Sequence, residues 1–298
     1  MTIMYLTFGQ NIEYHVQAYL SMLSFRKQTA ENDHIVMVTT NPEFYRHARN
    51  WVDIIAVNDD QVQLWKGPHQ YIFRVKTMAI RQLIKKYPQD HLIFVDTDTV
   101  LVGDLQVLRE LMDQGTGLMH RNEGHPSQMK GPSRKMWRTI NGHTYNGITL
   151  TDRHCMWNSG IIGMPREKME QIVSDTLVLL DGMLDEGVKS FNIEQYAISV
   201  AMQTHVQMSE AYQYVGHYWG NKQGWQKLAV EVLLRSYMQE NSLEEELELI
   251  DDELMQRLPV YIHHSNTSRR LKKFITRLFP DKGHQYVKSN IPKKDTHN

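Results

Sequence analysis

Apolar and polar positions in the first hundred residues follow two alternating periods. Short runs rich in β-branched and aromatic residues predict four strands, at 3–8, 35–40, 52–57 and 92–95. Between them, apolar residues recur at helical spacing over 12–25 and 73–87, and Pro88 ends the second stretch. Strands that alternate with such helices favour a mainly parallel sheet covered on both faces, which binds its ligands at the carboxyl ends of the strands.

The pattern loosens after residue 101. Asp104 is a candidate N-cap for a helix running to residue 113, and 117–120 predicts a short strand. Residues 121–155 are rich in Gly, Pro, His, Asn and basic residues and lack periodicity. Such a stretch is typical of an active-site loop or lid, of a mobile segment, or of a disordered surface insertion.

Regular structure is expected again after residue 155. The pattern predicts a strand at 160–164, a helix from Pro165 and another at 193–202. Residues 229–256 also favour helix, and seven acids between 244 and 253 indicate a solvated helical face.

Composition excludes several classes of protein. The chain has 298 residues, of which 41% are apolar and 22% charged, as in ordinary globular proteins. Its 33 basic and 34 acidic residues give a net charge of −1, which argues against a duplex nucleic-acid partner. No apolar run reaches the ~18–20 residues of a membrane span. The N-terminus lacks signal-peptide features, and the lone Cys155 allows no internal disulfide and no cysteine-rich zinc site. We therefore expect a soluble cytoplasmic protein.

The C-terminal segment differs from the rest of the chain. From Arg269 onward, nine basic residues accompany two acids. Apolar residues recur among them at helical spacing: Leu271, Phe274, Ile275, Leu278 and Phe279. Either this stripe packs on the body of the protein, or it contacts an anionic membrane surface through residues 268–279.

The most informative segment is Asp96-Thr97-Asp98, which directly follows the apolar strand at 92–95. Residues two apart on a strand point to the same side, so both carboxylates can face one cation. Hard divalent ions such as Mg²⁺ and Mn²⁺ take carboxylate oxygens together with substrate phosphate. The segment therefore predicts a metal–diphosphate site.

Here the chain resembles the metal-dependent glycosyltransferases of the glycosyltransferase-A fold, in particular the family-8 branch. Asp96, Thr97 and Asp98 match the family's Asp-x-Asp motif. The segment Thr7-Phe8-Gly9 resembles the one that contacts the nucleotide base. The resemblance covers roughly residues 1–225.

Further segments resemble the family's sugar-facing elements. Arg74 and Lys76 stand where the family keeps basic residues that face the sugar nucleotide. Asn158 and Ser159 begin a segment similar to the Asn-x-Gly strand that lines the donor sugar.

Glu194 and Gln195 resemble the acidic-Gln element that reaches the sugar. An inverting transferase needs a carboxylate base near the acceptor hydroxyl, and Glu194 fits that role. A retaining enzyme places a polar amide near the anomeric carbon, and Gln195 fits that one. Either residue could instead be a helix N-terminal residue that the helix dipole favours. The stereochemistry of the transfer therefore stays open.

The segment from His217 to Lys222 resembles the family-8 element in which His is the third metal ligand and Lys binds the diphosphate. It is one residue shorter before its lysine than the family pattern. His263, after a strand-like run, competes with His217 as the ligand.

The resemblance implies a single α/β catalytic domain of the glycosyltransferase-A type over residues 1–265, with a mainly parallel sheet. Residues 1–101 would bind the nucleotide and 102–265 the acceptor, and 266–298 would form a helical basic appendage. The implied activity is sugar transfer from a nucleoside-diphospho-sugar, with UDP as the expected nucleotide. It would use Mn²⁺ or Mg²⁺ and a saccharide acceptor, such as a lipid-linked or cell-envelope glycan.

Two other functions remain open at this point. The segment from Asp96 to Leu101 also fits the nucleophile motif of haloacid-dehalogenase phosphatases, although that motif normally lies on the first strand. A non-catalytic module that binds sugar nucleotides or glycans would keep the same residues.

Overall fold

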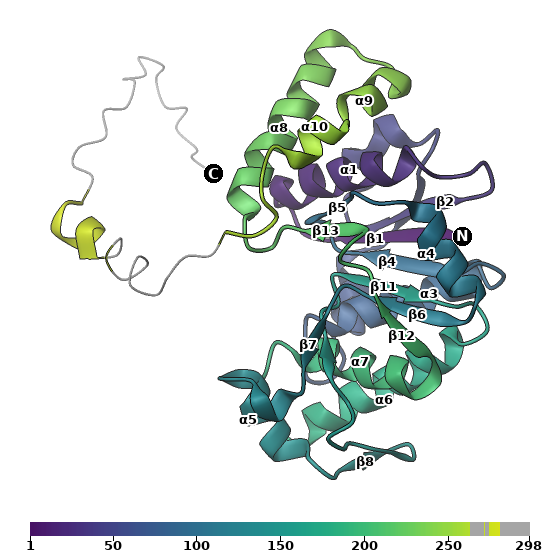
Figure 1. Cartoon of the computed structure of the whole chain (residues 1–298), viewed down its shortest axis with the longest axis vertical. Helices are drawn as coiled ribbons and strands as arrows, with labels where there is room; N and C mark the ends of the chain where they lie inside the picture. The colour runs from purple at the N-terminus through teal and green to yellow at the C-terminus, as the bar shows by residue number, and fades with distance from the viewer. Residues whose placement is uncertain (263–270, 272–273, 281–298) are drawn as a thin grey trace, which may run out of the picture. The chain divides into compact units, whose positions relative to one another are not determined.

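A seven-stranded sheet forms the centre of the computed structural model (Figure 1). Its strands are, in spatial order, β12 (Gln207–Glu210), β6 (Thr116–Met119), β11 (Ile161–Met164), β4 (Leu92–Val95), β1 (Thr2–Thr7), β2 (His34–Thr39) and β3 (Asp53–Ala56). Neighbouring strands are parallel except where β11 pairs antiparallel with β4 and β6. The predicted α/β class with a mainly parallel sheet is confirmed.

The structure describes residues 1–262, 271 and 274–280. Residues 1–261 make one compact unit, and residues 262–298 form a second unit. The predicted limits at 101 and 265 stay predictions, and the competing metal ligand His263 lies outside the described residues.

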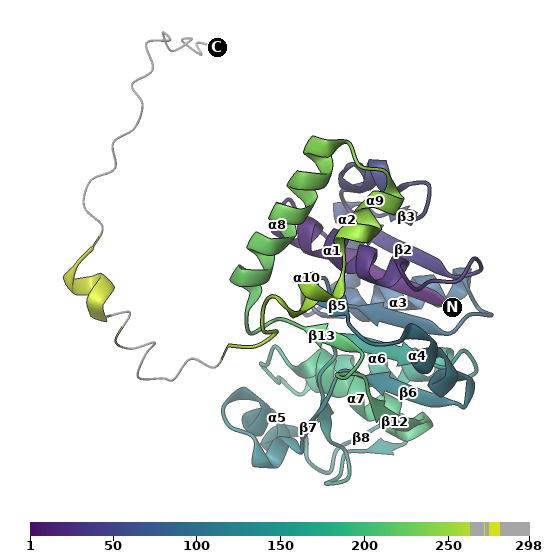
Figure 2. The same cartoon turned by 45° about the horizontal axis from the view of Figure 1, so that its top comes forward.

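Alternate residues of β1 belong to two hydrophobic cores, one on each face of the sheet. Ile3 and Tyr5 are fully buried in one core and Met4 in the other, so the strand needs apolar residues almost throughout. Figure 2 shows the covering helices from a second direction. The first core is covered by α1 (Ile12–Arg26), α4 (Leu105–Asp113) and α8 (Lys222–Gln239). The second is covered by α3 (Arg74–Lys86), α6 (Met169–Asp185) and α7 (Ile193–His205).

The strand order reverses between β1 and β4. From β1 the chain adds β2 and then β3 on one side, and β4 then joins the other side of β1. In open α/β sheets, ligands bind in the crevice at the carboxyl ends of the strands where this reversal occurs. Asp96 directly follows the last residue of β4, so the fold places the Asp-x-Asp segment at that crevice.

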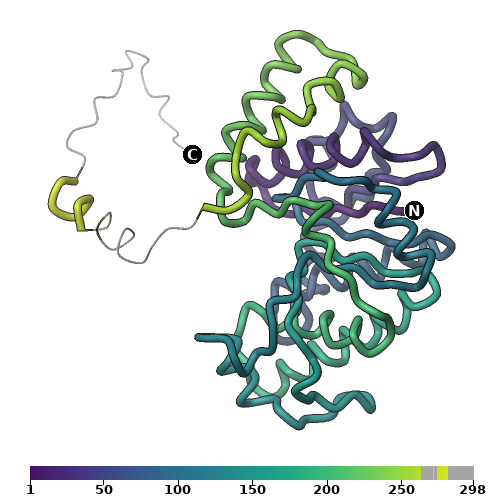
Figure 3. Tube along the Cα trace, in the orientation of Figure 1, coloured from purple at the N-terminus to yellow at the C-terminus, as the bar shows by residue number. Residues whose placement is uncertain are grey.

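A separate two-stranded sheet connects this crevice with a distant part of the chain. β5 (Thr99–Leu101) pairs antiparallel with β13 (Val215–His217) (Figures 1 and 3). His217 lies opposite Thr99. The Tyr218 amide also donates to the Asp98 carbonyl at 2.9 Å. The pairing therefore brings His217 beside the two aspartates.

The expectation of a segment without regular structure at 121–155 is wrong. The segment holds β7 (Asn122–Gly124), the 3₁₀ helix η2 (Pro126–Gln128), α5 (Pro132–Ile140), β8 (Thr144–Tyr145) and β9 (Ile148–Thr149), and β10 (Met156–Trp157) follows it. α5 buries Met136, Trp137 and Ile140 in the second core. A helix of nine residues shows too few apolar repeats to stand out in the sequence.

Other element boundaries also differ from the sequence pattern. The helix expected from Pro165 begins at Met169, because Lys168 closes a turn onto the Pro165 carbonyl. The helical region predicted at 229–256 consists of the end of α8, α9 (Leu243–Leu249) and α10 (Asp252–Gln256). Its acids are not all solvated, because Glu246 accepts hydrogen bonds from Tyr19 and Ser236. The pattern missed the 3₁₀ helix η1 (Pro42–Ala48) and α2 (Asp59–Trp65).

Trp225 fixes α8 against the segment that carries His217. Its fully buried indole stacks on Tyr218 with centroids 4.9 Å apart and donates to the Pro259 carbonyl. We expect Trp225→Ala to lower the free energy of unfolding, measured by urea denaturation, by about 3–5 kcal/mol. Val230→Ala, at a 43% exposed position of the same helix, should change it by less than about 0.5 kcal/mol. Equal losses in the two variants would contradict this role of Trp225.

Candidate metal centre

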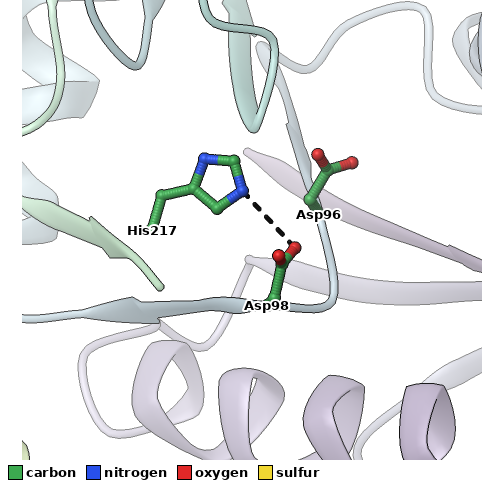
Figure 4. A group of neighbouring side chains, drawn as sticks. All are labelled: Asp96, Asp98 and His217. Atoms are coloured by element: carbon green, nitrogen blue, oxygen red, sulfur yellow. Dashed lines mark ion pairs between the residues drawn. The ribbon is translucent and has the colours of Figure 1, made fainter. Parts of the chain in front are cut away.

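Asp96, Asp98 and His217 form a compact cluster beyond the carboxyl end of β4 (Figure 4). One potential ligand atom from each residue lies within 4.8 Å of the other two. His217 Nε2 is 3.4 Å from Asp98 Oδ1. Two carboxylates and an imidazole suit a divalent cation such as Mn²⁺, and the carboxylates suit Mg²⁺. The structure thus brings together the three residues singled out in the sequence.

Asn158 determines which nitrogen of His217 faces the aspartates. The Asn158 Oδ1 atom accepts from the Gly160 amide at 3.1 Å, while Nδ2 donates to Glu123. The same Oδ1 atom lies 3.0 Å from His217 Nδ1, so Nδ1–H must be the donor. A protonated His217 pairs through Nε2 with the Asp98 carboxylate, whereas the neutral ring directs the lone pair of Nε2 towards Asp98. Two acceptors that face each other in this way are suited to hold a cation between them.

Gly160 allows the His217 ring to occupy its position. A Cβ atom on residue 160 would lie 2.3 Å from both Cε1 and Nδ1 of His217, closer than any tolerated contact. The ring therefore packs directly on the backbone that follows Asn158 and Ser159.

Lys222 provides a second positive partner for Asp98. Its Nζ atom lies 2.9 Å from Asp98 Oδ2, and 48% of the lysine side chain stays exposed. Burial by itself would raise the pKa of Asp98, but His217 and Lys222 lower it well below its ordinary value. Asp98 is therefore a buried carboxylate in its charged form, and the exposed lysine can reach an anion beside it.

Lys76 connects Asp96 to the interior of the site. Its Nζ atom is 3.4 Å from Asp96 Oδ1 and 3.6 Å from Glu194 Oε2. It also donates to the hydroxyl and the carbonyl of Ser159, each at 3.2 Å. Burial lowers the pKa of Lys76, but the two carboxylates outweigh it and raise the pKa above its ordinary value. Lys76 is thus a charged group at the centre of four oxygen partners.

Glu194 and Gln195 lie in the first turn of α7 and have different surroundings. Glu194 is buried, and burial raises the pKa of its carboxyl group although Lys76 opposes this. Among the described residues, its Oε1 atom has no hydrogen-bond partner. Gln195 donates through Nε2 to Glu123 Oε2 at 2.9 Å. A buried carboxylate oxygen without a partner is suited to accept a hydrogen bond from a ligand hydroxyl.

The structure does not bring Arg74 into this cluster. Its guanidinium binds both carboxylate oxygens of Asp181 at 2.8 and 2.9 Å and also donates to the Trp65 carbonyl. Arg74 therefore fastens the start of α3, the helix that carries Lys76, to α6 and α2.

The segment expected to contact a nucleotide base lies where β1 ends. The Thr7 hydroxyl is buried and donates to Thr39 on β2. Phe8 packs against the second core, and Gly9 has a positive φ of 81°. Across the crevice, the Thr97 carbonyl accepts from the Tyr218 hydroxyl. Thr7 is thus the last residue of β1 and Asp96 directly follows β4, the two strands that flank the reversal point.

Glu123 is a residue of the site that the sequence did not reveal. Its two carboxylate oxygens hold Asn158 and Gln195, and it lies on β7 in the segment expected to lack structure. No motif surrounds it, so only the pairing of β7 with β10 places it there.

A cavity of about 560 Å³ opens beside His217. Its wall includes His120, Arg121, Glu123, Asn158, Trp219 and Tyr261. The His120 ring packs edge-on against His217, and burial together with the His217 charge lowers the pKa of His120 to about 4. At neutral pH, His120 therefore adds no positive charge to this cavity.

No protein-family model matches the sequence, and a search of curated proteins finds no relative. Among solved structures, the chain is similar to the bifunctional glycosyltransferase WbbM, with 17% identity over 71% of this chain and a TM-score of 0.46. It spans 39% of the WbbM chain. It is also similar to the galactosyltransferase LgtC in complex with donor and acceptor sugar analogues, with 10% identity, 71% and 74% coverage and a TM-score of 0.48.

Mouse xyloside xylosyltransferase 1 is similar to the same extent, with 13% identity, 70% and 85% coverage and a TM-score of 0.46. All three are glycosyltransferases by name, as is the family that the sequence resembles. Because these identities and TM-scores are low, the function is inferred from the residues of the site.

Asn158 offers a direct test of the metal centre. Asn158→Ala removes the acceptor that fixes the His217 ring, so we expect the affinity for Mn²⁺, measured by isothermal titration calorimetry, to fall about 10–100-fold. The matched control is Asn122→Ala, because the side-chain oxygen of Asn122 accepts from the Gly124 amide on β7 and, among the described residues, the side chain makes no hydrogen bond to His217. Unchanged Mn²⁺ affinity in Asn158→Ala would contradict the role of His217 as a ligand.

Proposed function

We propose that the protein is a metal-dependent glycosyltransferase that moves a sugar from a nucleoside-diphospho-sugar, with UDP as the nucleotide, to a saccharide acceptor. The observation that carries the proposal is the Asp96–Asp98–His217 cluster, with the Lys222 ammonium on Asp98, at the reversal point of a parallel sheet. This arrangement offers three metal ligands and a cation for a phosphate on one side of the crevice.

The roles of the residues follow from their atoms. Asp96, Asp98 and His217 would hold Mn²⁺ or Mg²⁺. The bound ion supplies positive charge to the diphosphate as the bond to the sugar breaks. Lys222 leaves half of its side chain exposed and would pair with the same diphosphate. The nucleotide base would lie near Thr7, Phe8 and Gly9, with Thr97 on the opposite strand end.

The donor sugar would lie between the metal centre and the start of α7. Glu194 Oε1 has no partner among the described residues and would accept from a sugar hydroxyl, while Lys76 and Ser159 hold the other oxygen. Asn158 and Gln195, joined through Glu123, would line the same space. Arg74 would act indirectly by holding the helix that carries Lys76. We propose no stereochemical outcome, because both Glu194 and Gln195 are within this region.

The acceptor would occupy the cavity beside His217. Trp219 and Tyr261 form one wall, with ring centroids 5.0 Å apart in an edge-to-face arrangement. Aromatic rings offer the apolar faces of a sugar ring a flat surface, and Glu123 and Asn158 offer polar atoms to its hydroxyls.

Asp98 is the decisive residue for activity. We expect Asp98→Asn to reduce Mn²⁺-dependent release of UDP from UDP-sugars by about 100-fold or more, because a neutral amide replaces a charged metal ligand. Asp152→Asn removes an exposed carboxylate outside the site and should leave the rate unchanged. A protein that binds UDP-sugars with Mn²⁺ but never releases UDP would be a binding module. Mg²⁺-dependent hydrolysis of p-nitrophenyl phosphate that is lost in Asp96→Asn would establish the phosphatase instead.

We further propose that the enzyme is cytoplasmic and binds peripherally to membranes. In the described residues, no helix combines the length and apolar character needed to cross a bilayer. Residues 274–278 are helical. In the C-terminal tail, residues 268–298, the apolar residues recur among basic residues at the spacing of one helical face. A lipid-linked or cell-envelope glycan as the acceptor would agree with such a location.

Removal of the tail tests this localisation. Deleting residues 268–298 should abolish co-sedimentation with vesicles that contain phosphatidylglycerol, because each basic residue near an anionic surface contributes about 1 kcal/mol. The rate of UDP release should stay unchanged in the same variant. Vesicle binding that persists after the deletion would rule out the tail as the membrane contact.

A further inference from the structure

One segment beside the site carries only positive charge. Residues 124–151 contain no Asp or Glu, but four Lys and Arg residues: Lys130, Arg134, Lys135 and Arg138. The chain as a whole has 33 basic and 34 acidic residues, so an excess of this kind is a local feature. All four side chains belong to α5 or to the turn before it, and we call them the basic surface.

The basic surface occupies the solvent side of α5. The other side of the helix is buried, through Met136, Trp137 and Ile140. The four basic residues are all exposed. By contrast, none of the large apolar side chains of residues 124–151, all of which the structure describes, is exposed. The surface thus lacks the apolar residues with which an amphipathic helix enters a bilayer.

The positive charges of this surface are not balanced by their surroundings. Arg134 and Arg138 are four residues apart on the helix, a spacing at which like charges repel. The first turn of α5 contains no acid, so the helix dipole adds further positive potential. Among the residues that the structure describes, none of the four basic side chains makes an ion pair, whereas His143 in the same segment pairs with Glu186. An anionic partner would relieve this repulsion.

α5 is fixed to the sugar side of the site. Asn192 Nδ2 donates to the Ser133 hydroxyl at 2.9 Å, and Asn192 directly precedes α7, which carries Glu194 and Gln195. Directly before residue 124, β7 carries Glu123, which lines the cavity beside His217. α5 lies next to β7 in both views of the fold (Figures 1 and 2). An acceptor saccharide that extends out of the cavity would therefore pass close to the basic surface.

We propose that the basic surface binds an anionic acceptor glycan, one whose repeating units carry carboxylate or phosphodiester groups, while its end occupies the cavity beside His217. This inference rests on the proposed function, because it names the class of acceptor for that site. A glycan is the occupant that fits, since the surface offers charges without apolar side chains. Arg121, whose guanidinium lies over the Tyr212 ring at the cavity wall, adds one more positive group on this path.

The test compares two triple variants of equal charge. Arg134→Glu, Lys135→Glu and Arg138→Glu together reverse the basic surface. Lys85→Glu, Lys227→Glu and Arg235→Glu together make the same change in net charge at exposed residues of α3 and α8. Binding is measured by fluorescence anisotropy at low and high salt. The labelled probes are an oligogalacturonate with one carboxylate per sugar, a poly(glycerol phosphate) with one phosphodiester per unit, and a neutral maltooligosaccharide.

We expect the wild-type protein and the α3–α8 variant to bind one or both anionic probes at low salt and to bind the neutral probe more weakly. The α5 variant should bind the anionic probes about tenfold more weakly or worse. The probe that binds more tightly shows whether the surface prefers carboxylate or phosphodiester groups. Equal losses in both triple variants, or equal binding of the neutral probe, would overturn the proposal. So would a selective loss of binding to phosphatidylglycerol vesicles in the α5 variant with unchanged glycan binding.

A second readout separates this inference from the proposed function. Mn²⁺-dependent UDP release in the absence of acceptor depends on the metal centre alone and should be equal in the wild type and both triple variants. If the wild type releases no UDP, the proposed function fails, whatever the probes show. If UDP release is normal but the α5 variant binds the anionic probes as the wild type does, only the acceptor inference fails.

Discussion

The pairing of β5 with β13 is the constraint on which the site depends. β5 begins one residue after Asp98, and its antiparallel partner ends at His217, so this short ladder joins metal ligands that are 119 positions apart in the sequence. The Asp98 carbonyl accepts from the Tyr218 amide and extends the same ladder. Lys222 then begins α8, whose buried Trp225 stacks on Tyr218. One β-ladder thus orients the imidazole, the lysine and the carboxylate towards one another.

The charges of the site are arranged before any ligand binds. Asp98 is held in its ionised form by His217 and Lys222, and Lys76 lies among Asp96, Glu194 and Ser159. Buried charges are costly unless they are paired and hydrogen bonded, so such a network keeps its members in fixed positions. The hydrogen bonds that connect Glu123 to Asn158 and Asn158 to His217 likewise keep the imidazole in a fixed position. A cation and a diphosphate would therefore meet a site that needs little rearrangement.

The sequence predicted the features that depend on local patterns. Continuous apolar runs located β1 to β4, and the position of Asp96 directly after a strand indicated the metal centre. Features that depend on distant contacts were not predictable in the same way. β5 and β13 have three residues each, too few to show a period. Glu123 belongs to the site through the pairing of β7 with β10, and Arg74 matched a motif position while its actual partner, Asp181, lies 107 residues away.

The measurement that tests the central claim most directly is the position of a bound metal. Crystals grown with Mn²⁺ and UDP should show an anomalous difference peak about 2.0–2.6 Å from carboxylate oxygens of Asp96 and Asp98. His217 Nε2 should complete the protein ligands of the same ion, and UDP should lie at the ends of β1 and β4. A manganese peak at another position, or UDP bound without a metal between these residues, would contradict the account.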